Sequence, residues 1–171
     1  MSSVEAETKP KADRLRPVLG LVAWILLTLT IGMIGGRATA AGIPDWYDKL
    51  NRPSLTPPDS VFGPVWTVLY LMMAVAIWLV WLRQGDSRAG RSAATAYMVQ
   101  LFLNGLWSVV FFGSQSPAGG MLVILLLWFA ILWTLVVFWK QRLVSGVLLI
   151  PYLAWVSFAA VLNYQVWVLN P

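Results

Sequence analysis

Long stretches without a charged residue are the feature that most limits how this chain can fold. They run over residues 18–36, 60–82, 92–139 and 143–171. A helix needs about 20 apolar residues to cross the hydrocarbon core of a bilayer. The third stretch is long enough for two such helices, and the sequence GSQSPAGG at residues 113–120 marks the turn between them. The pattern therefore predicts five membrane helices, over residues 18–39, 62–82, 92–112, 119–140 and 144–168.

Composition and connectivity predict an all-α integral membrane protein with one membrane domain. Hydrophobic residues make up 59% of the chain and charged residues 11%, and the mean hydropathy is +0.73. Barrel strands would alternate in polarity over about 10 residues, whereas these stretches are continuously apolar. We expect a single five-helix domain over residues 18–171, with a polar tail at residues 1–17 that has no fold of its own. The lipid bilayer is thus the first expected partner.

The N-terminal segment has an alternative interpretation as a signal peptide, with Ala38-Thr39-Ala40 as the cleavage site. Its apolar stretch of about 19 residues exceeds the 7–15 residues of a signal sequence. We therefore favour an uncleaved first helix.

The distribution of lysine and arginine predicts the orientation. Nine of these residues lie in the tail, the 83–91 loop and the 140–142 turn, and three lie on the opposite side. Basic loops stay in the cytoplasm, so the N-terminus is expected there and the C-terminus outside. The net charge of +5 is then explained by topology and lipid head groups, and nucleic acid is not an expected partner. We favour a bacterial cell membrane, with the bacterial or mitochondrial outer membrane as alternatives.

A proline-rich connection at residues 46–70 follows the first predicted helix. Pro53, Pro57, Pro58 and Pro64 each restrict the backbone and remove an N–H donor. We expect a stiff, irregular lid loop between the first two helices, which can close a pocket over the apolar bundle.

Missing residue types limit the chemistry. The chain has no cysteine and no histidine, and all seven acidic residues lie outside the predicted spans. Zinc sites, thiolate nucleophiles and histidine-ligated haem are therefore excluded, and a carboxylate relay at membrane depth is not expected. We predict no metal and no cofactor.

Polar and aromatic residues within the spans fall on three helical stripes. The stripes are Trp66, Tyr70 and Met73; Gln100, Asn104, Trp107 and Phe111; and Tyr152, Trp155, Ala159 and Asn163. Side-chain amides in hydrocarbon need partners, so these stripes are expected to face the interior of the bundle. They either line a pocket or hold the helices together.

Taken in order, these residues resemble the TspO/MBR family of tryptophan-rich sensory proteins and translocator proteins. The resemblance covers about residues 18–168 and rests on the following motifs: Trp46-Tyr47, Pro53, Pro57-Pro58, Phe62, Pro64, Trp66, Leu69-Tyr70, Gln100, Asn104, Trp107, Phe111-Phe112, the PYLAW sequence at 151–155, and Leu162-Asn163-Tyr164.

The resemblance implies a ligand pocket beneath the lid, a homodimer, and binding of porphyrins such as protoporphyrin IX, of sterols in some members, and of benzodiazepine-type compounds. A porphyrin would be a ligand here rather than a cofactor. Motif positions and stripes together give the candidate ligand-binding residues: Tyr47, Pro57, Trp66, Tyr70, Gln100, Asn104, Trp107, Tyr152, Trp155, Ala159 and Asn163.

Two departures from the family pattern affect the expected ligands. Residues 54–56 are Ser-Leu-Thr where many relatives have an aromatic residue, which weakens stacking at the lid. No basic residue follows Tyr164, so the sterol pattern near the C-terminus is incomplete. The reversed pattern is met by Arg91, Tyr97 and Val99, but it matches easily by chance.

Three function classes remain open. The first, which we prefer, is a receptor or carrier for porphyrin-like ligands in tetrapyrrole transport or stress signalling. The second is an enzyme that degrades porphyrin in light, with Trp66 and Trp155 exchanging electrons with the excited ring. The third is a structural helix bundle with a vestigial pocket.

Overall fold

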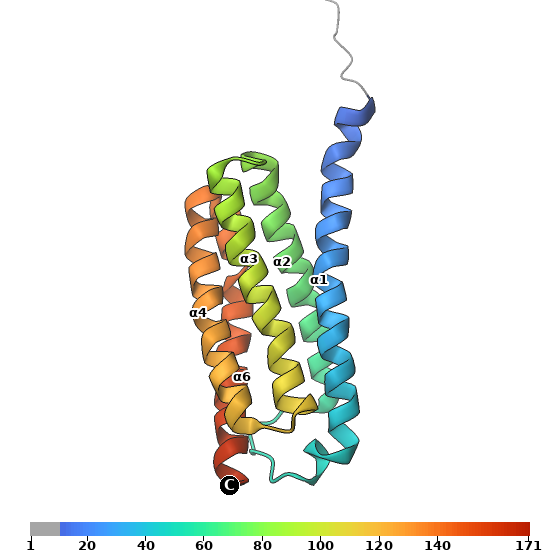
Figure 1. The fold of residues 1–171 in the computed structure, drawn as a ribbon, viewed down its shortest axis with the longest axis vertical. Helices are drawn as coiled ribbons and strands as arrows, with labels where there is room; N and C mark the ends of the chain where they lie inside the picture. The colour runs from blue at the N-terminus through green and yellow to red at the C-terminus, as the bar shows by residue number, and fades with distance from the viewer. Residues whose placement is uncertain (1–10) are drawn as a thin grey trace, which may run out of the picture.

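Five long helical segments run side by side along the molecule, and the lid and the C-terminus lie at one end of it (Figure 1). The computed structural model describes residues 11–171. The helices are α1 (Lys11–Asp45), α2 (Asp59–Gln84), α3 (Arg88–Ser108), α4 (Pro117–Gln141), α5 (Leu143–Val147) and α6 (Ile150–Leu169). A short 3-10 helix, η1 (Tyr47–Lys49), follows α1, and a π-helical turn, η2 (Val109–Gly113), extends α3.

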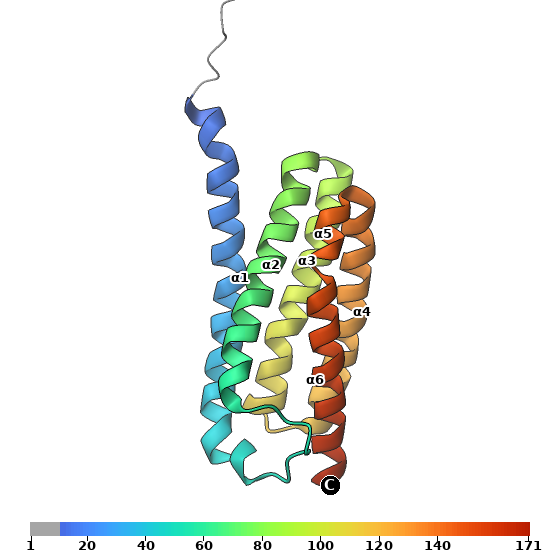
Figure 2. The same cartoon turned by 180° about the vertical axis from the view of Figure 1, so that it is seen from behind.

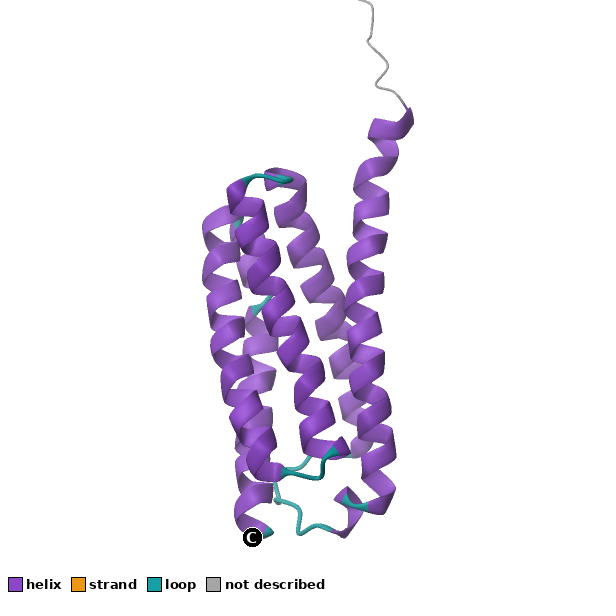
Figure 3. Ribbon diagram, viewed as in Figure 1, coloured by secondary structure: helices purple, strands orange, loops and turns teal. Residues whose placement is uncertain are grey.

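Five segments are long and apolar enough to cross a membrane: Leu15–Pro44, Asp59–Gln84, Arg88–Gly113, Pro117–Gln141 and Leu143–Leu169. No strand occurs within residues 11–171 (Figure 3). The predicted all-α bundle of five spans is therefore confirmed, and the chain is an integral, multi-pass membrane protein.

The first helix is longer than its sequence predicts. It begins at Lys11, so residues 11–17 are helical, although we expected them to belong to a tail without a fold. Residues 1–10 of that expected tail lie outside the described part of the chain. Charged residues do not prevent a helix from continuing beyond the apolar stretch, because lysine and arginine are good helix formers.

Local signals explain the two tight turns of the bundle. Gly85 ends α2 with a φ of +51°, a conformation that glycine adopts without strain. The hydroxyl of Ser87 then accepts a hydrogen bond from the Gly90 N–H at 3.1 Å and caps α3. Ser116 caps α4 in the same way, through the Gly119 N–H at 3.1 Å. The predicted turn at residues 113–120 is thus shorter than expected, because α4 already begins at Pro117.

The fifth span is interrupted, although a continuous helix was predicted over residues 144–168. α5 ends at Val147 and α6 begins at Ile150. Pro151 lacks the N–H that would bond to the carbonyl of Val147, so the helix breaks one turn before the proline.

Helix packing fills one half of the bundle more completely than the other. On α2, the fully buried residues lie between Leu69 and Val80, whereas residues 59–68 include no buried side chain. α5 packs against both α4 and α2, whereas α6 packs mainly against α4. The fifth span therefore makes its closest backbone approach to α2 at the end away from the lid (Figure 2).

The lid comprises residues 46–58 and is shorter than the predicted connection. α2 begins at Asp59, so Pro64 lies inside the helix and not in the lid. Proline is tolerated near a helix start because the first N–H groups of a helix have no intrahelical partner. Within the lid, Pro53 is buried.

Asn51 and Asn170 fasten the lid to the end of α6. The Asn51 backbone N–H donates to Oδ1 of Asn170 at 2.9 Å, and Nδ2 of Asn170 donates to the Asn51 carbonyl at 3.1 Å. Nδ2 of Asn170 also donates to the Val166 carbonyl at 2.8 Å. This pair of asparagines is a latch between the lid and the last helical turn.

Replacing Asn170 by alanine removes the latch and is expected to raise hydrogen–deuterium exchange in residues 46–58 by about fivefold, since each lost hydrogen bond contributes about 1 kcal/mol. Exchange is followed by mass spectrometry in lipid nanodiscs. Val168→Ala is the control, because Val168 is exposed on the same helix. Equal exchange in both variants would show that the latch does not hold the lid.

Candidate functional site

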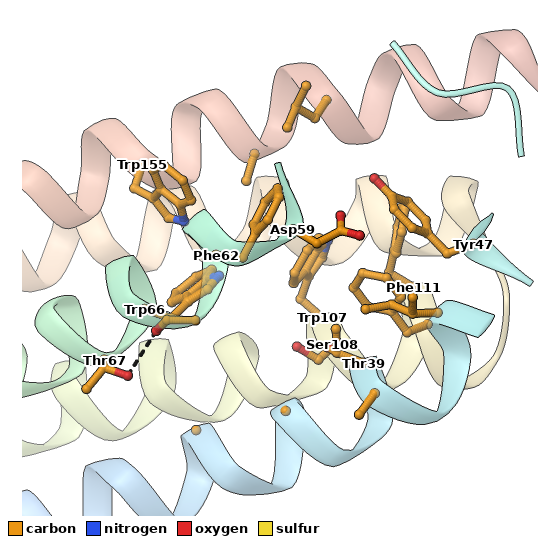
Figure 4. Close-up of a pocket in the computed structure, with 18 of the residues that line it drawn as sticks. Thr39, Tyr47, Asp59, Phe62, Trp66, Thr67, Trp107, Ser108, Phe111 and Trp155 are labelled. Atoms are coloured by element: carbon orange, nitrogen blue, oxygen red, sulfur yellow. Dashed lines mark hydrogen bonds between the residues drawn. The ribbon is translucent and has the colours of Figure 1, made fainter. Parts of the chain in front are cut away.

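A cavity of about 460 Å³ lies under the lid between α1, α2, α3 with η2, and α6 (Figure 4). α4 and α5 contribute no residue to its wall. Most of the lining side chains are apolar or aromatic, and the volume falls within the range of about 300–1,000 Å³ that is typical of small-molecule sites. The cavity occupies the half of the bundle where α2 has no buried side chain.

Flat aromatic side chains form two stacked pairs at the cavity. Trp66 stacks on Tyr70 from the next turn of α2, with ring centroids 5.5 Å apart and an interplanar angle of 28°. Trp107 stacks on Phe111 at 5.4 Å and 26°. Each pair arises because residues four apart on a helix lie on one face. The site therefore presents extended π surfaces to any ligand.

Tyr47 connects the lid to the wall. Its ring meets Phe111 and Phe112 edge to face, with centroids 6.1 and 5.4 Å away. The Arg52 guanidinium lies 4.9 Å from the centre of the Tyr47 ring, a cation–π contact. Burial raises the pKa of Tyr47 above its usual value, and Arg52 opposes that shift only in part. The phenol is therefore protonated and uncharged at neutral pH.

Trp155 carries a hydrogen-bond donor that has no partner. Its indole Nε1 is buried without an acceptor, while Phe62 packs edge-on against the ring at 5.9 Å. Trp107 differs, because its Nε1 donates to Oδ1 of Asn163 at 3.0 Å, and Nδ2 of Asn163 donates to the Pro117 carbonyl at 2.8 Å. Trp155 therefore carries a buried indole N–H without a protein acceptor, and Trp66 in the same wall also makes no side-chain hydrogen bond within the described residues.

A hydrogen-bonded triad lies beneath the cavity. The Tyr70 hydroxyl donates to Oδ1 of Asn104 at 2.7 Å, and Nδ2 of Asn104 donates to the Tyr152 hydroxyl at 3.0 Å. Asn104 is 2% exposed and Tyr152 is fully buried. The triad joins α2, α3 and α6 and supports the cavity through the Tyr70 ring.

The structure brings seven of the eleven candidate residues to the cavity: Tyr47, Trp66, Tyr70, Trp107, Trp155, Ala159 and Asn163. Asn104 and Tyr152 lie underneath in the triad. Gln100 is buried away from the wall, and both polar atoms of its amide lack a partner. Pro57 lines a separate, shallow hollow in the lid with Arg52 and Asp59. The binding role of all eleven stays a prediction.

The α1 wall of the cavity was not predicted. It includes Gly32, Gly36, Thr39 and Ile43. Gly32 and Gly36 have the spacing of a close helix contact, but Gly32 alone of the two makes one, since an added Cβ there would lie 2.5 Å from the Tyr70 ring. At Gly36 an added Cβ would meet nothing within 4 Å. In the sequence, this wall is marked by small residues at helical spacing. Such spacing does not tell whether the small residues face a neighbouring helix or an open cavity.

Comparisons with known proteins agree with the resemblance. The family model described as TspO/MBR family matches residues 24–168. The Tryptophan-rich protein TspO of Archaeoglobus fulgidus is 40% identical over 153 residues, which cover 90% of this chain and 98% of that protein. Protein CrtK of Rhodobacter capsulatus is 39% identical over 126 residues, 74% of this chain and 79% of that protein. The Translocator protein of Homo sapiens is 37% identical over 123 residues, 71% of this chain and 73% of that protein.

The two glycines of α1 give a matched test of the cavity. Gly36→Leu is expected to fill empty space and weaken binding of protoporphyrin IX by about tenfold or more, with little change in melting temperature. Gly32→Ala is expected to lower the free energy of unfolding by about 1–3 kcal/mol, because the new methyl overlaps the Tyr70 ring. Thermal melts and fluorescence titrations measure both. If Gly36→Leu binds normally, the ligand does not occupy this cavity.

Asn104→Ala is expected to destabilise the protein by about 1–3 kcal/mol, because it leaves the hydroxyls of Tyr70 and Tyr152 without their shared partner. Asn104→Asp keeps a side-chain oxygen that can accept the hydrogen bond from the Tyr70 hydroxyl. Its free energy of unfolding is compared with that of Asn104→Ala. A chemical-denaturation series in detergent measures the change. Unaltered stability of Asn104→Ala would mean that the triad does not hold the helices together.

Proposed function

The chain belongs to the TspO/MBR family, and from this premise we propose that it is a membrane receptor or carrier that binds porphyrins in the cavity under the lid. The names of its relatives, tryptophan-rich sensory protein and translocator protein, suggest sensing and transport. Protoporphyrin IX is the proposed ligand class, and tetrapyrrole transport or stress signalling is the proposed role. Benzodiazepine-type compounds fit the same description of flat, largely apolar ligands.

The pairing of aromatic surfaces with a few unpaired donors carries this proposal. A tetrapyrrole is a flat π system with a polar edge, so it needs stacking surfaces and few hydrogen bonds. The stacked pairs Trp66–Tyr70 and Trp107–Phe111 supply such surfaces. Trp155 supplies an unpaired N–H.

Sterol binding has less support. Tyr97 of the reversed sterol pattern is fully buried, and its hydroxyl lies 2.5 Å from that of Thr28. Its ring also packs edge-on against Trp24 at 5.6 Å. This tyrosine therefore presents no surface to a membrane sterol, which weighs against sterol recognition through this pattern.

Orientation and assembly follow from the same proposal. With the N-terminus in the cytoplasm of a bacterial cell, the lid and the cavity mouth would face outward, and a ligand would reach the cavity from that side. The family resemblance favours a homodimer.

Light-driven degradation of porphyrin is the second candidate function. Trp66 and Trp155, the two indoles named for electron exchange with an excited ring, both line the cavity. A bound porphyrin would therefore lie close to both. Dioxygen would be the oxidant that such a degradation consumes.

One experiment separates these functions. The purified protein in lipid vesicles is titrated with protoporphyrin IX in darkness, and tryptophan quenching is followed; the sample is then illuminated while porphyrin absorption is recorded. Saturable quenching with an unchanged spectrum would support the receptor or carrier. Protein-dependent conversion to a new chromophore would favour the enzyme, and no saturable quenching would favour the structural bundle.

Trp155→Phe is expected to weaken porphyrin binding by about three- to tenfold, since it keeps the aromatic packing but removes a hydrogen bond of about 0.5–1.5 kcal/mol. Trp133→Phe is the matched control, because Trp133 is 45% exposed on the outside of α4 and also loses one indole signal. Equal affinities of the two variants would contradict the role of the free donor.

A further inference from the structure

One carboxylate lines the cavity. Asp59, the first residue of α2, is the single acidic residue in the described cavity wall, and no lysine or arginine lies in that wall. Figure 4 shows its carboxylate between the rings of Phe62 and Tyr47 at the lid end. The two tyrosines of the wall, Tyr47 and Tyr70, are neutral phenols. The formal charge of the wall is therefore −1, and it is concentrated at the mouth.

Arg52 neutralises this charge incompletely. Its Nη1 lies 3.6 Å from Oδ1 of Asp59, while its Nη2 forms an ion pair with Asp48. Two carboxylates thus share one guanidinium, whose flat face is already occupied by the Tyr47 ring. Asp59 lines both the cavity and the shallow hollow in the lid, whereas Arg52 lines the hollow alone. A ligand in the cavity meets the carboxylate before it meets the cation.

The polar end of a ligand is directed toward this mouth. At the deep end of the cavity, the Tyr70 hydroxyl and the Asn104 amide satisfy each other, and the described cavity wall holds no cationic side chain that could pair with a carboxylate. Burying an unpaired charged group there would be costly. A flat ligand with one polar edge therefore places that edge near Asp59.

From this geometry we propose that Asp59 makes the cavity selective for ligand charge. Flat apolar ligands that present an uncharged or cationic polar edge to the lid bind better than ligands that present carboxylates. The physical reason is repulsion between like charges at the cavity mouth, which solvent weakens but does not abolish, because the Asp59 side chain is 59% exposed. This inference rests on the proposed function, and it ranks neutral and cationic tetrapyrroles above protoporphyrin IX, whose two carboxylates weaken its binding without preventing it.

Protoporphyrin IX and its dimethyl ester test the proposal, because they share one ring system and differ in two carboxylates. Dissociation constants for both are measured by tryptophan quenching in vesicles of zwitterionic phosphatidylcholine at neutral pH. The wild type is expected to favour the ester. Asp59→Asn is expected to shift the ratio of the two constants about fivefold toward the acid, with little change for the ester. The shift should shrink as salt is raised, because salt screens charges at the mouth.

Two matched controls each remove one carboxylate. Asp48→Asn frees the same guanidinium of Arg52 without altering the cavity wall, and Asp86→Asn changes an exposed acid in the loop between α2 and α3, away from the lid. The proposal holds if Asp59→Asn alone moves the ratio by the expected amount. A similar shift in Asp48→Asn would overturn it, because the freed arginine would then explain the effect. An unchanged ratio in Asp59→Asn would also overturn it.

The two proposals fail in different ways. Saturable binding of both porphyrins with an unchanged ratio would leave porphyrin binding intact and overturn the charge selectivity alone. Absence of saturable quenching by both porphyrins would overturn the proposed function, and the charge selectivity with it.

Discussion

The need to pair polar groups within hydrocarbon determines how this bundle is organised. Asn104 lies in the C-terminal part of α3, inside the membrane span, where an unpaired amide would be costly, and it is satisfied by the hydroxyls of Tyr70 and Tyr152. Those two tyrosines come from α2 and α6, so one amide holds three helices in register. The closely packed core lies on one side of this triad and the cavity on the other. The Tyr70 ring belongs to both, since its hydroxyl bonds to the triad and its face stacks on Trp66.

Much of the fold could be predicted because the high hydropathy of membrane helices can be read directly from the sequence. Their faces could also be predicted: Trp66, Trp107, Trp155 and Asn163 reach the cavity because residues three or four apart share one side of a helix. Helical spacing predicts which face of a helix a residue occupies, but it does not predict how far below the cavity wall the side chain lies. It therefore could not distinguish Asn104 and Gln100, which are buried below or away from the wall, from the residues that line it.

The remaining errors have local physical causes. Pro64 was assigned to the lid because proline disfavours helix interiors, yet near the start of α2 the missing N–H has little effect. Pro57 was carried over from the family motif, but the lid directs it into a shallow hollow beside Arg52. The α1 wall was missed because a glycine gives no sign of whether its open side meets a neighbour or empty space. Asp59 was counted as one of several loop acids, and only the position of the helix start places it at the cavity mouth.

Glycines on two sides of α1 explain why the cavity stays open while α1 packs closely against α3. On one side of α1, an added Cβ at Gly35 would lie 3.1 Å from the Ser108 hydroxyl, and one at Gly105 of α3 would lie 3.0 Å from Ile31, so the two helices approach closely there. On the cavity side, Gly36 and Gly63 face open space, with nothing within 4 Å of an added Cβ. A side chain at either position would occupy part of this open space without a clash. Two vacant positions in the wall of one apolar cavity therefore lower the packing of the free protein, and a flat ligand that fills the space would recover those contacts.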